Sequence, residues 1–343
     1  MLMTKMQEEI FEQKTALKTS FEVNLDVAKL VAEKIANPDV KHVVMVARGS
    51  SMNACLFFKY LFEVRGGKPI TFYNPSVITK YGAAYDFSSA LVIGVSQSGQ
   101  GADVNEVIKQ AKEQGAYTFA ITNFADSPLA QLCDSTLLLS VGLEKSVAAT
   151  KTMTAQMLLL KTISDFYKFK EANFSKVYDS ITTSLDNFDC ADKIANFLAD
   201  KNEVIVLSRG LSLAVAQEIS LKLQETCYIN ARPYAISDFY HGPFALVDEN
   251  KVFILISTDK QTRDDSLEML QKLQALGAKV IAISNDDNIN NTADFAFPLC
   301  LTCKCASPIG AVIGGQIIAL KTALLRGVNP DAPRGLKKIT ITK

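Results

Sequence analysis

The sequence predicts an α/β protein built from two tandem, doubly wound units, each a parallel sheet covered by helices on both faces. Two observations predict this architecture. Short, continuous apolar runs alternate with helix-like stretches, which is typical of strands buried on both faces of a parallel sheet. The same succession of landmarks then returns 160 to 162 residues later, which indicates two copies of one unit.

In the first copy, two helical stretches over 4–19 and 24–36 precede the first apolar run. Further helices are expected over 52–64 and 102–114, the second of which ends at Gly115. The apolar runs expected to form strands are 43–47, 70–73, 91–95, 118–122 and 137–141.

Five landmarks carry the repeat. The matched pairs are 43–49 with 204–210, Ser96 with Ser257, Gly115 with Gly277, Asn123 with Asn285, and Asp134 with Asp294. We therefore divide the chain into five parts. They are an N-terminal helical segment (1–27), a first domain (28–170), a helical linker (171–202), a second domain (203–326) and a C-terminal tail (327–343).

Composition narrows the function classes. Lys plus Arg equals Asp plus Glu, 36 against 36, and no basic run is present, which argues against nucleic acid or an anionic membrane as a partner. We expect no membrane span and no signal peptide, and seven scattered cysteines suit a cytoplasmic protein. Cys300, Cys303 and Cys305 cluster without an evident fourth metal ligand, so we expect no metal site.

Polar loops follow two strands of the first copy. Ser50 and Ser51 follow the first strand, and Ser96-Gln97-Ser98-Gly99 follows the run at 91–95. Ligands of doubly wound sheets bind beyond the carboxyl ends of strands, where helix N-termini favour anions. The second copy has Ser257-Thr258-Asp259-Lys260 instead, so we expect one phosphate site, in the first copy. The alternative is that these residues only form turns and helix caps.

A helix-like stretch over 218–225 carries Glu218, Lys222 and Glu225 at i, i+4 and i+7, which places them on one face. The alternative is a solvated charged face. His241, one of two histidines, follows in the turn His241-Gly242-Pro243. A carboxylate, a lysine and a histidine in this order form a candidate acid–base set.

Six motifs resemble those of the double SIS (sugar isomerase) domain family, and the resemblance covers essentially the whole chain. The motifs are Arg48–Ser51, Ser96–Gly99, Glu144–Lys151, Glu218–Glu225, His241–Pro243 and the C-terminal Gly335–Lys338. The chain is similar to the isomerase part of glucosamine-6-phosphate synthase, and more so to SIS-type glucosamine-6-phosphate deaminases. The resemblance implies flavodoxin-like domains and no cofactor.

The resemblance also implies residue roles. Ser50, Ser51, Ser96, Gln97 and Ser98 correspond to phosphate-binding positions, and Val147 corresponds to a backbone contact with the sugar. Glu225 corresponds to the carboxylate that moves a proton between C1 and C2, with Lys222 as its catalytic neighbour. His241 corresponds to the ring-opening histidine that reaches in from a partner subunit, so we expect a homodimer with shared sites. Lys338 corresponds to the tail lysine that meets the sugar carbonyl, as an oxygen ligand or a Schiff base.

Three features depart from the synthase pattern. Gly101 replaces a Ser or Thr and Ala149 replaces a Ser, which weakens the case for tight phosphate binding. Residue 2 is Leu where a glutaminase would carry its nucleophilic Cys, so we expect the catabolic reaction: glucosamine 6-phosphate to fructose 6-phosphate and ammonia.

Two other functions stay open. One is a deglycase for fructosamine phosphates or an aldose–ketose isomerase. The other is a non-catalytic phosphosugar sensor, which would not need Lys222, Glu225, His241 and Lys338 together.

Overall fold

The computed structural model describes residues 3–83, 85–301 and 304–338, which form two compact units. Unit A comprises the described residues of 15–144, 151–174 and 337–338 and contains the first sheet. Unit B comprises those of 3–14, 145–150 and 175–336 and contains the second sheet. The segments of the two units interleave along the chain.

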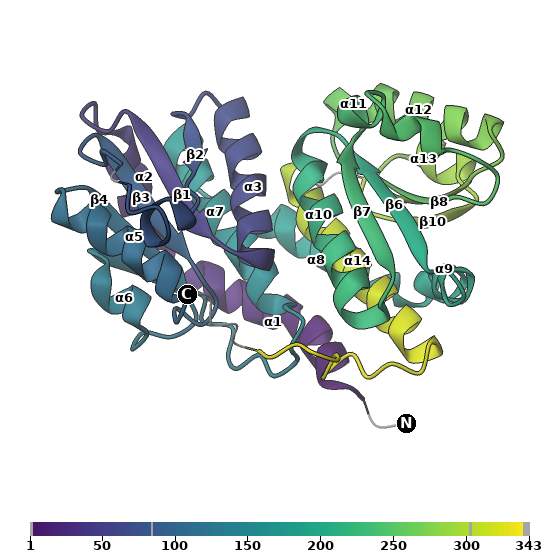
Figure 1. Ribbon diagram of the computed structural model, residues 1–343, viewed down its shortest axis with the longest axis horizontal. Coiled ribbons are helices and arrows are strands. Elements are labelled where there is room, and N and C mark those ends of the chain that lie inside the picture. The colour runs from purple at the N-terminus through teal and green to yellow at the C-terminus, as the bar shows by residue number, and fades with distance from the viewer. Residues whose placement is uncertain (1–2, 84, 302–303, 339–343) are drawn as a thin grey trace. The chain divides into compact units, whose positions relative to one another are not determined.

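Unit A is built on five parallel strands in the order β2-β1-β3-β4-β5. The strands are β1 (His42–Ala47), β2 (Ile70–Phe72), β3 (Ala90–Val95), β4 (Tyr117–Thr122) and β5 (Ser135–Leu138). Its helices are α2 (Leu25–Ala36), α3 (Gly49–Val64), α4 (Ser76–Thr79), α5 (Ala102–Glu113), α6 (Pro128–Leu132) and α7 (Lys151–Phe169). Helix α7 packs against both α2 and α3 (Figure 1).

Unit B repeats this order with β10-β9-β8-β6-β7. Its strands are β6 (Glu203–Ser208), β7 (Asn230–Ala235), β8 (Val252–Ser257), β9 (Lys279–Ser284) and β10 (Phe295–Pro298). Its longer helices are the start of α1 (Lys5–Val23), α8 (Ser175–Asp186), α9 (Ala191–Leu198), α10 (Leu213–Lys222), α12 (Arg263–Ala275) and α14 (Ser307–Leu325). Short helical turns are η1 (Phe188–Cys190), η2 (Gly210–Ser212), η3 (Leu223–Cys227), α11 (Ile236–Phe239), η4 (Pro243–Leu246), η5 (Lys260–Thr262), α13 (Asp287–Thr292) and η6 (Lys304–Ala306). The two-domain α/β prediction is therefore confirmed.

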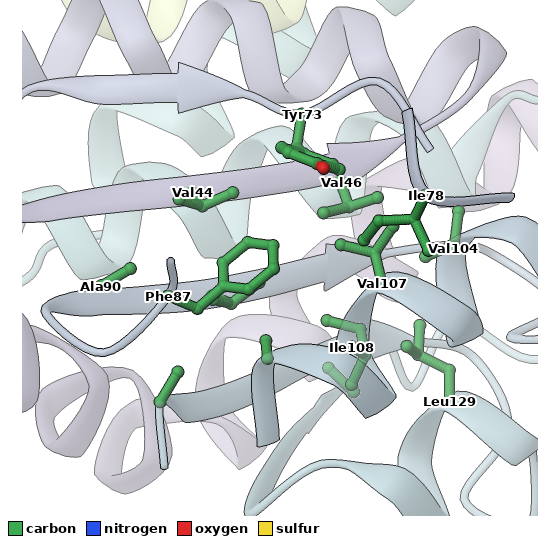
Figure 2. Packing of buried hydrophobic residues seen from close by; sticks show 14 residues of the cluster. Val44, Val46, Tyr73, Ile78, Phe87, Ala90, Val104, Val107, Ile108 and Leu129 are labelled. Atoms are coloured by element: carbon green, nitrogen blue, oxygen red, sulfur yellow. The ribbon is translucent and has the colours of Figure 1, made fainter. Parts of the chain in front are cut away.

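The core of unit A shows why continuous apolar runs formed the strands. Val44 and Val46 lie on one face of β1, since alternate side chains of a strand point the same way. They pack with Phe87, Val107 and Ile108, all fully buried, over the inner face of α5 (Figure 2). The opposite face of the same strands is covered as well. Every residue of β3 and all but the first residue of β1 are therefore buried, which explains their continuous apolar sequence.

The repeated aspartates have the same structural role in both units. Asp134 Oδ2 accepts the backbone N–H of Thr118 at 2.9 Å, and Asp294 Oδ2 accepts that of Val280 at 2.9 Å. Each carboxylate therefore ties the start of the last strand to the start of its neighbour. The glycines that precede these strands, Gly115 and Gly277, both have positive φ, 83° and 85°.

Helix α14 is long and apolar enough to cross a membrane by length and composition alone, which the sequence analysis did not note. In the structure most of this helix is buried, and it packs against α8, α9 and α10 of unit B. The apolar character of α14 on all sides is therefore explained by its position in the core of unit B.

Candidate functional site

The two serine loops of unit A start at the same edge of its sheet. Strands β1 and β3 are neighbours whose last residues, Ala47 and Val95, pair in register. Ser50 and Ser51 lie in the first turn of α3, and Ser96-Gln97-Ser98 follows β3 directly. The strand order reverses between β1 and β3: β2 is added on one side of β1, and β3, β4 and β5 follow on the other. Doubly wound folds bind ligands at such a reversal.

Hydrogen bonds fix the shape of the loop after β3. Ser96 Oγ accepts the N–H of Gly99 at 3.1 Å, and Ser98 Oγ accepts that of Gln100 at 3.3 Å. Gly99 has a φ of 64°, and a Cβ there would lie 2.3 Å from Ser127 Oγ. The loop therefore requires glycine at this position, beyond the general preference of turns for small residues.

An ion pair that the sequence reading missed holds this edge together. Arg48, the residue before α3, contacts the buried carboxylate of Asp103 through Nε and Nη2, each at 3.0 Å. Asp103 lies in the first turn of α5. The pair thus links the two segments that carry the serine loops. No periodicity joins residues 55 positions apart, so the sequence offered no signal for it.

The corresponding loop of unit B carries a carboxylate of its own and borders a cavity of about 410 Å³, which is also lined by Lys260 and Arg263. Asp259 Oδ1 accepts the N–H of Gln261 at 3.2 Å and so caps the short helix η5. Asp259 therefore stands where unit A has Ser98. The expectation of one phosphate site, in unit A, stays a prediction.

The charged residues of α10 are buried rather than solvated. Lys222 Nζ lies 3.4 Å from Glu218 Oε1 and 2.5 Å from Glu225 Oε2. The side chains of Glu218 and Lys222 are 0% and 1% exposed, and that of Glu225 is 20% exposed. The shared face predicted from the i, i+4, i+7 spacing is confirmed, and the alternative of a solvated charged face is wrong.

Glu225 lies in a π-helical turn. The α-helix ends at Lys222, residues Leu223–Cys227 form the π-turn η3, and Tyr228 ends it with a φ of 55°. Such turns are frequent at functional sites. A cavity of about 330 Å³ opens beside Glu225 and is also lined by Leu221, Gln224, Tyr228, Arg334 and Leu336.

His241 lies apart from this cavity within unit B. It follows α11, its backbone N–H donates to the carbonyl of Asp238 at 3.0 Å, and its side chain is exposed. It does not line the cavity at Glu225. Gly242 next to it has a φ of 130°, a conformation that favours glycine.

Lys338 is a partly buried residue of unit A. Its Nζ lies 2.6 Å from Glu144 Oε2, and its side chain is 24% exposed, whereas Lys337 is exposed. Glu144 is fully buried and also accepts Thr152 Oγ1 at 2.7 Å. Lys338 is therefore held in an ion pair, and its partner Glu144 is a residue to which the sequence analysis gave no role.

Val147 is half-buried in the irregular segment 145–150 of unit B, where its N–H donates to the carbonyl of Asp331 at 3.3 Å. Among the residues with described positions, no cluster of three or more His, Cys, Asp and Glu side chains suits a metal ion. Of the cysteine cluster, Cys303 lies outside the described residues, Cys305 is a free thiol and Cys300 is disulfide-bonded.

Comparison with known proteins identifies the chain's relatives. The SIS domain model matches residues 38–163 and 197–300. The glutamine–fructose-6-phosphate aminotransferase (isomerizing) of Thermococcus kodakarensis is 31% identical over 97% of this chain, and that of Methanocaldococcus jannaschii is 32% identical over 97%. The chain spans 57% and 30% of the lengths of these two relatives.

Solved structures share the fold over nearly the full chain. The C-terminal domain of glucosamine-fructose-6-phosphate aminotransferase from Francisella tularensis matches with a TM-score of 0.86 and 27% identity, covering 97% of this chain and 99% of that one. A glucosamine-6-phosphate deaminase from Thermotoga maritima matches with a TM-score of 0.80, covering 99% of this chain and 100% of that one. At 23% identity, the second likeness shows the shared fold alone.

Proposed function

The chain belongs to the SIS domain family, and from this premise we propose that it is a phosphosugar isomerase acting at C1 and C2 of a hexose 6-phosphate. The specific reaction we propose is the conversion of glucosamine 6-phosphate to fructose 6-phosphate and ammonia. The observation that carries the proposal is Glu225: a carboxylate at the edge of a cavity, held in place by a buried lysine.

Glu225 is the proposed acid–base group. Its Oε2 is fixed by Lys222 at 2.5 Å, and Lys222 is in turn held by Glu218, which is fully buried. Burying three charges costs free energy, and replacing such groups with apolar residues is often neutral or stabilising. The arrangement is therefore better explained by chemistry at Glu225 than by stability of the fold.

The proposed reaction proceeds by proton transfer. After ring opening, Glu225 removes the proton from C2, and the electrons of the C2–H bond form an enolamine as the C1 oxygen is protonated. Glu225 then returns the proton to C1, which gives an imine at C2. Water adds to the imine carbon, the C–N bond breaks, and fructose 6-phosphate and ammonia leave. No oxidant or reductant is required.

We assign the phosphate to the serine loops of unit A. Ser50, Ser51, Ser96 and Ser98 offer hydroxyl groups, Gln97 offers an amide, and the first turn of α3 offers backbone N–H groups. The reversal of strand order between β1 and β3 supports the assignment. Val147 is assigned to a backbone contact with the sugar.

His241 is the proposed ring-opening acid–base, because an imidazole exchanges protons near neutral pH. Its exposure within unit B supports action on a partner subunit, so we propose a homodimer with shared sites. Lys338 is proposed to meet the open-chain carbonyl. In this structure its Nζ forms an ion pair with Glu144 of the same unit.

Two alternatives compete with the deaminase reaction. Aldose–ketose isomerisation or deglycation of a fructosamine phosphate would use the same proton transfer at C1 and C2. A phosphosugar sensor would keep the serine loops, but it would gain nothing from the buried charges at Lys222 and Glu218 or from the cavity at Glu225. The buried charges therefore favour an enzyme.

Replacing Glu225 with Gln tests the assignment. We expect turnover of glucosamine 6-phosphate to fall by about 100-fold or more, since a positioned acid–base contributes about 10²–10⁴-fold. The matched control is Glu268→Gln, which changes an exposed glutamate of an i,i+4 ion pair on α12. Near-normal turnover by a folded Glu225→Gln protein would refute the role, whereas phosphosugar binding by the wild type without any turnover would favour the sensor.

A further inference from the structure

We propose that the N-terminal helix α1 positions the sugar-contact segment 145–150, and that Glu9 and Asp331 are positioning residues for the reaction. The inference rests on the proposed function, because Val147 in this segment is assigned to the sugar. All of its contacts lie within unit B.

Asp331 joins the start of α1 to the segment. Its carboxylate accepts the backbone N–H groups of Lys5 and Met6, both at 2.8 Å. A carboxylate at a helix N-terminus is stabilised by the helix dipole and satisfies orphan donors. The carbonyl of the same residue accepts the N–H of Val147 at 3.3 Å. One residue thus sets the helix and the sugar contact relative to each other.

Glu9 holds the residues on either side of Val147. Its side chain is 3% exposed, and its carboxylate accepts the N–H groups of Lys145 and Ser146, the latter at 3.2 Å. It also accepts Ser146 Oγ at 2.7 Å and Thr150 Oγ1 at 3.5 Å. Hydrogen bonds to an ionised acceptor are the stronger kind, and a buried acceptor of this kind fixes its donors firmly.

A pair of buried glutamines extends the same support to the end of the segment. Gln13, one turn after Glu9 on α1, donates to Gln316 Oε1 at 2.9 Å. Gln316 on α14 donates to the carbonyl of Thr150 at 3.2 Å. The segment has no regular structure of its own, so its backbone conformation depends on these side chains.

The arrangement predicts a separation of two affinities. The proposed phosphate loops belong to unit A, whereas Glu9 acts on the segment assigned to the sugar. Replacing Glu9 should therefore weaken the binding of a sugar phosphate and leave the affinity for inorganic phosphate unchanged. A purely structural glutamate would change both affinities together or neither.

The test is calorimetric titration of the full chain with fructose 6-phosphate and with inorganic phosphate. In Glu9→Gln an amide NH₂, which is a donor, replaces one carboxylate oxygen that accepts hydrogen bonds. This NH₂ would face the donors of Lys145 and Ser146 without bonding to them. We expect the Kd for fructose 6-phosphate to rise about tenfold or more, as loss of a charged hydrogen bond implies, and the Kd for phosphate to stay within about twofold. The control is Glu8→Gln, which removes a half-exposed glutamate on the same helix and should change neither Kd.

Equal changes in both affinities, or no change in either, would overturn the inference. Should Glu9→Gln not fold, Ser146→Ala removes one donor to Glu9. It should raise the Kd for fructose 6-phosphate about threefold, and an unchanged value would overturn the inference as well. If the wild type binds fructose 6-phosphate no more tightly than phosphate, the proposed function itself is refuted and the inference falls with it.

Discussion

Replacing Lys222 with Met tests the buried charges at the centre of unit B. Methionine keeps most of the length and apolar volume of the lysine stem, so the main change is the loss of the ammonium. That ammonium lies 3.4 Å from Glu218 and 2.5 Å from Glu225, and both Glu218 and Lys222 are buried. Removing one partner of a buried ion pair costs about 3–5 kcal/mol, because the remaining charge loses its counter-charge away from water.

A loss of this size shifts the midpoint of thermal unfolding. At about 2–4 °C per kcal/mol for a unit of roughly this size, Lys222→Met should melt roughly 6–20 °C below the wild type. The assay is thermal denaturation followed by circular dichroism. A double variant, Glu218→Gln with Lys222→Met, should recover part of the loss, since it also removes the buried negative charge.

The matched control is Lys272→Met on α12. Lys272 also contacts the glutamate four residues before it, at 2.6 Å, but the two side chains are 46% and 61% exposed. Exposed pairs contribute about 1 kcal/mol or less, so this variant should melt within a few degrees of the wild type. If the two variants lost equal stability, burial would not be the reason for the large contribution expected of the Lys222 contacts.

Three further predictions concern other parts of the chain. Gly101→Ser should lower the Kd for phosphate a few-fold in calorimetry, because a Cβ there meets nothing closer than 3.5 Å and the hydroxyl adds a hydrogen bond worth about 1 kcal/mol; unchanged or weaker binding would contradict this. Maleimide at pH 8, read by intact mass, should label the exposed Cys190 and spare Cys227, since burial raises the pKa of the Cys227 thiol to about 11; equal labelling would contradict the burial. Burial raises the pKa of Asp134, but hydrogen bonds from Thr118 and Lys112 outweigh it and lower the pKa overall, so its stabilisation should be present above about pH 4 and lost as the pH falls through the depressed pKa. Acid-unfolding curves of wild type and Asp134→Asn should therefore converge at low pH, and a constant gap would contradict this.

The sequence predicted the fold well because buried parallel strands have a simple pattern. Continuous apolar runs such as 91–95 have no solvent-facing position, and the repeat fixes two copies of one strand order. The strand expected at 137–141 instead covers Ser135–Leu138, and Ser140 beyond it has a φ of 53° that strands do not adopt. Apolar character alone does not mark where such a run stops pairing.

The candidate site was predicted only in part. Helical spacing correctly joined Glu218, Lys222 and Glu225, but the same spacing describes a solvated face, so it could not show that the charges are buried. The π-turn at Glu225 also has no signal in the spacing. Contacts such as Glu9 with Ser146 connect positions 137 residues apart, and no local pattern in one sequence reveals them.

The most direct test of the central claim is product formation by the purified chain given glucosamine 6-phosphate. Ammonia would be measured first, and fructose 6-phosphate would then be measured through a coupled dehydrogenase. We expect both products to appear in equal amounts. Ketose–aldose exchange without ammonia would replace the deaminase with an isomerase. The absence of any change at C1 and C2, in a protein that still binds phosphosugars, would contradict the proposed enzymatic function.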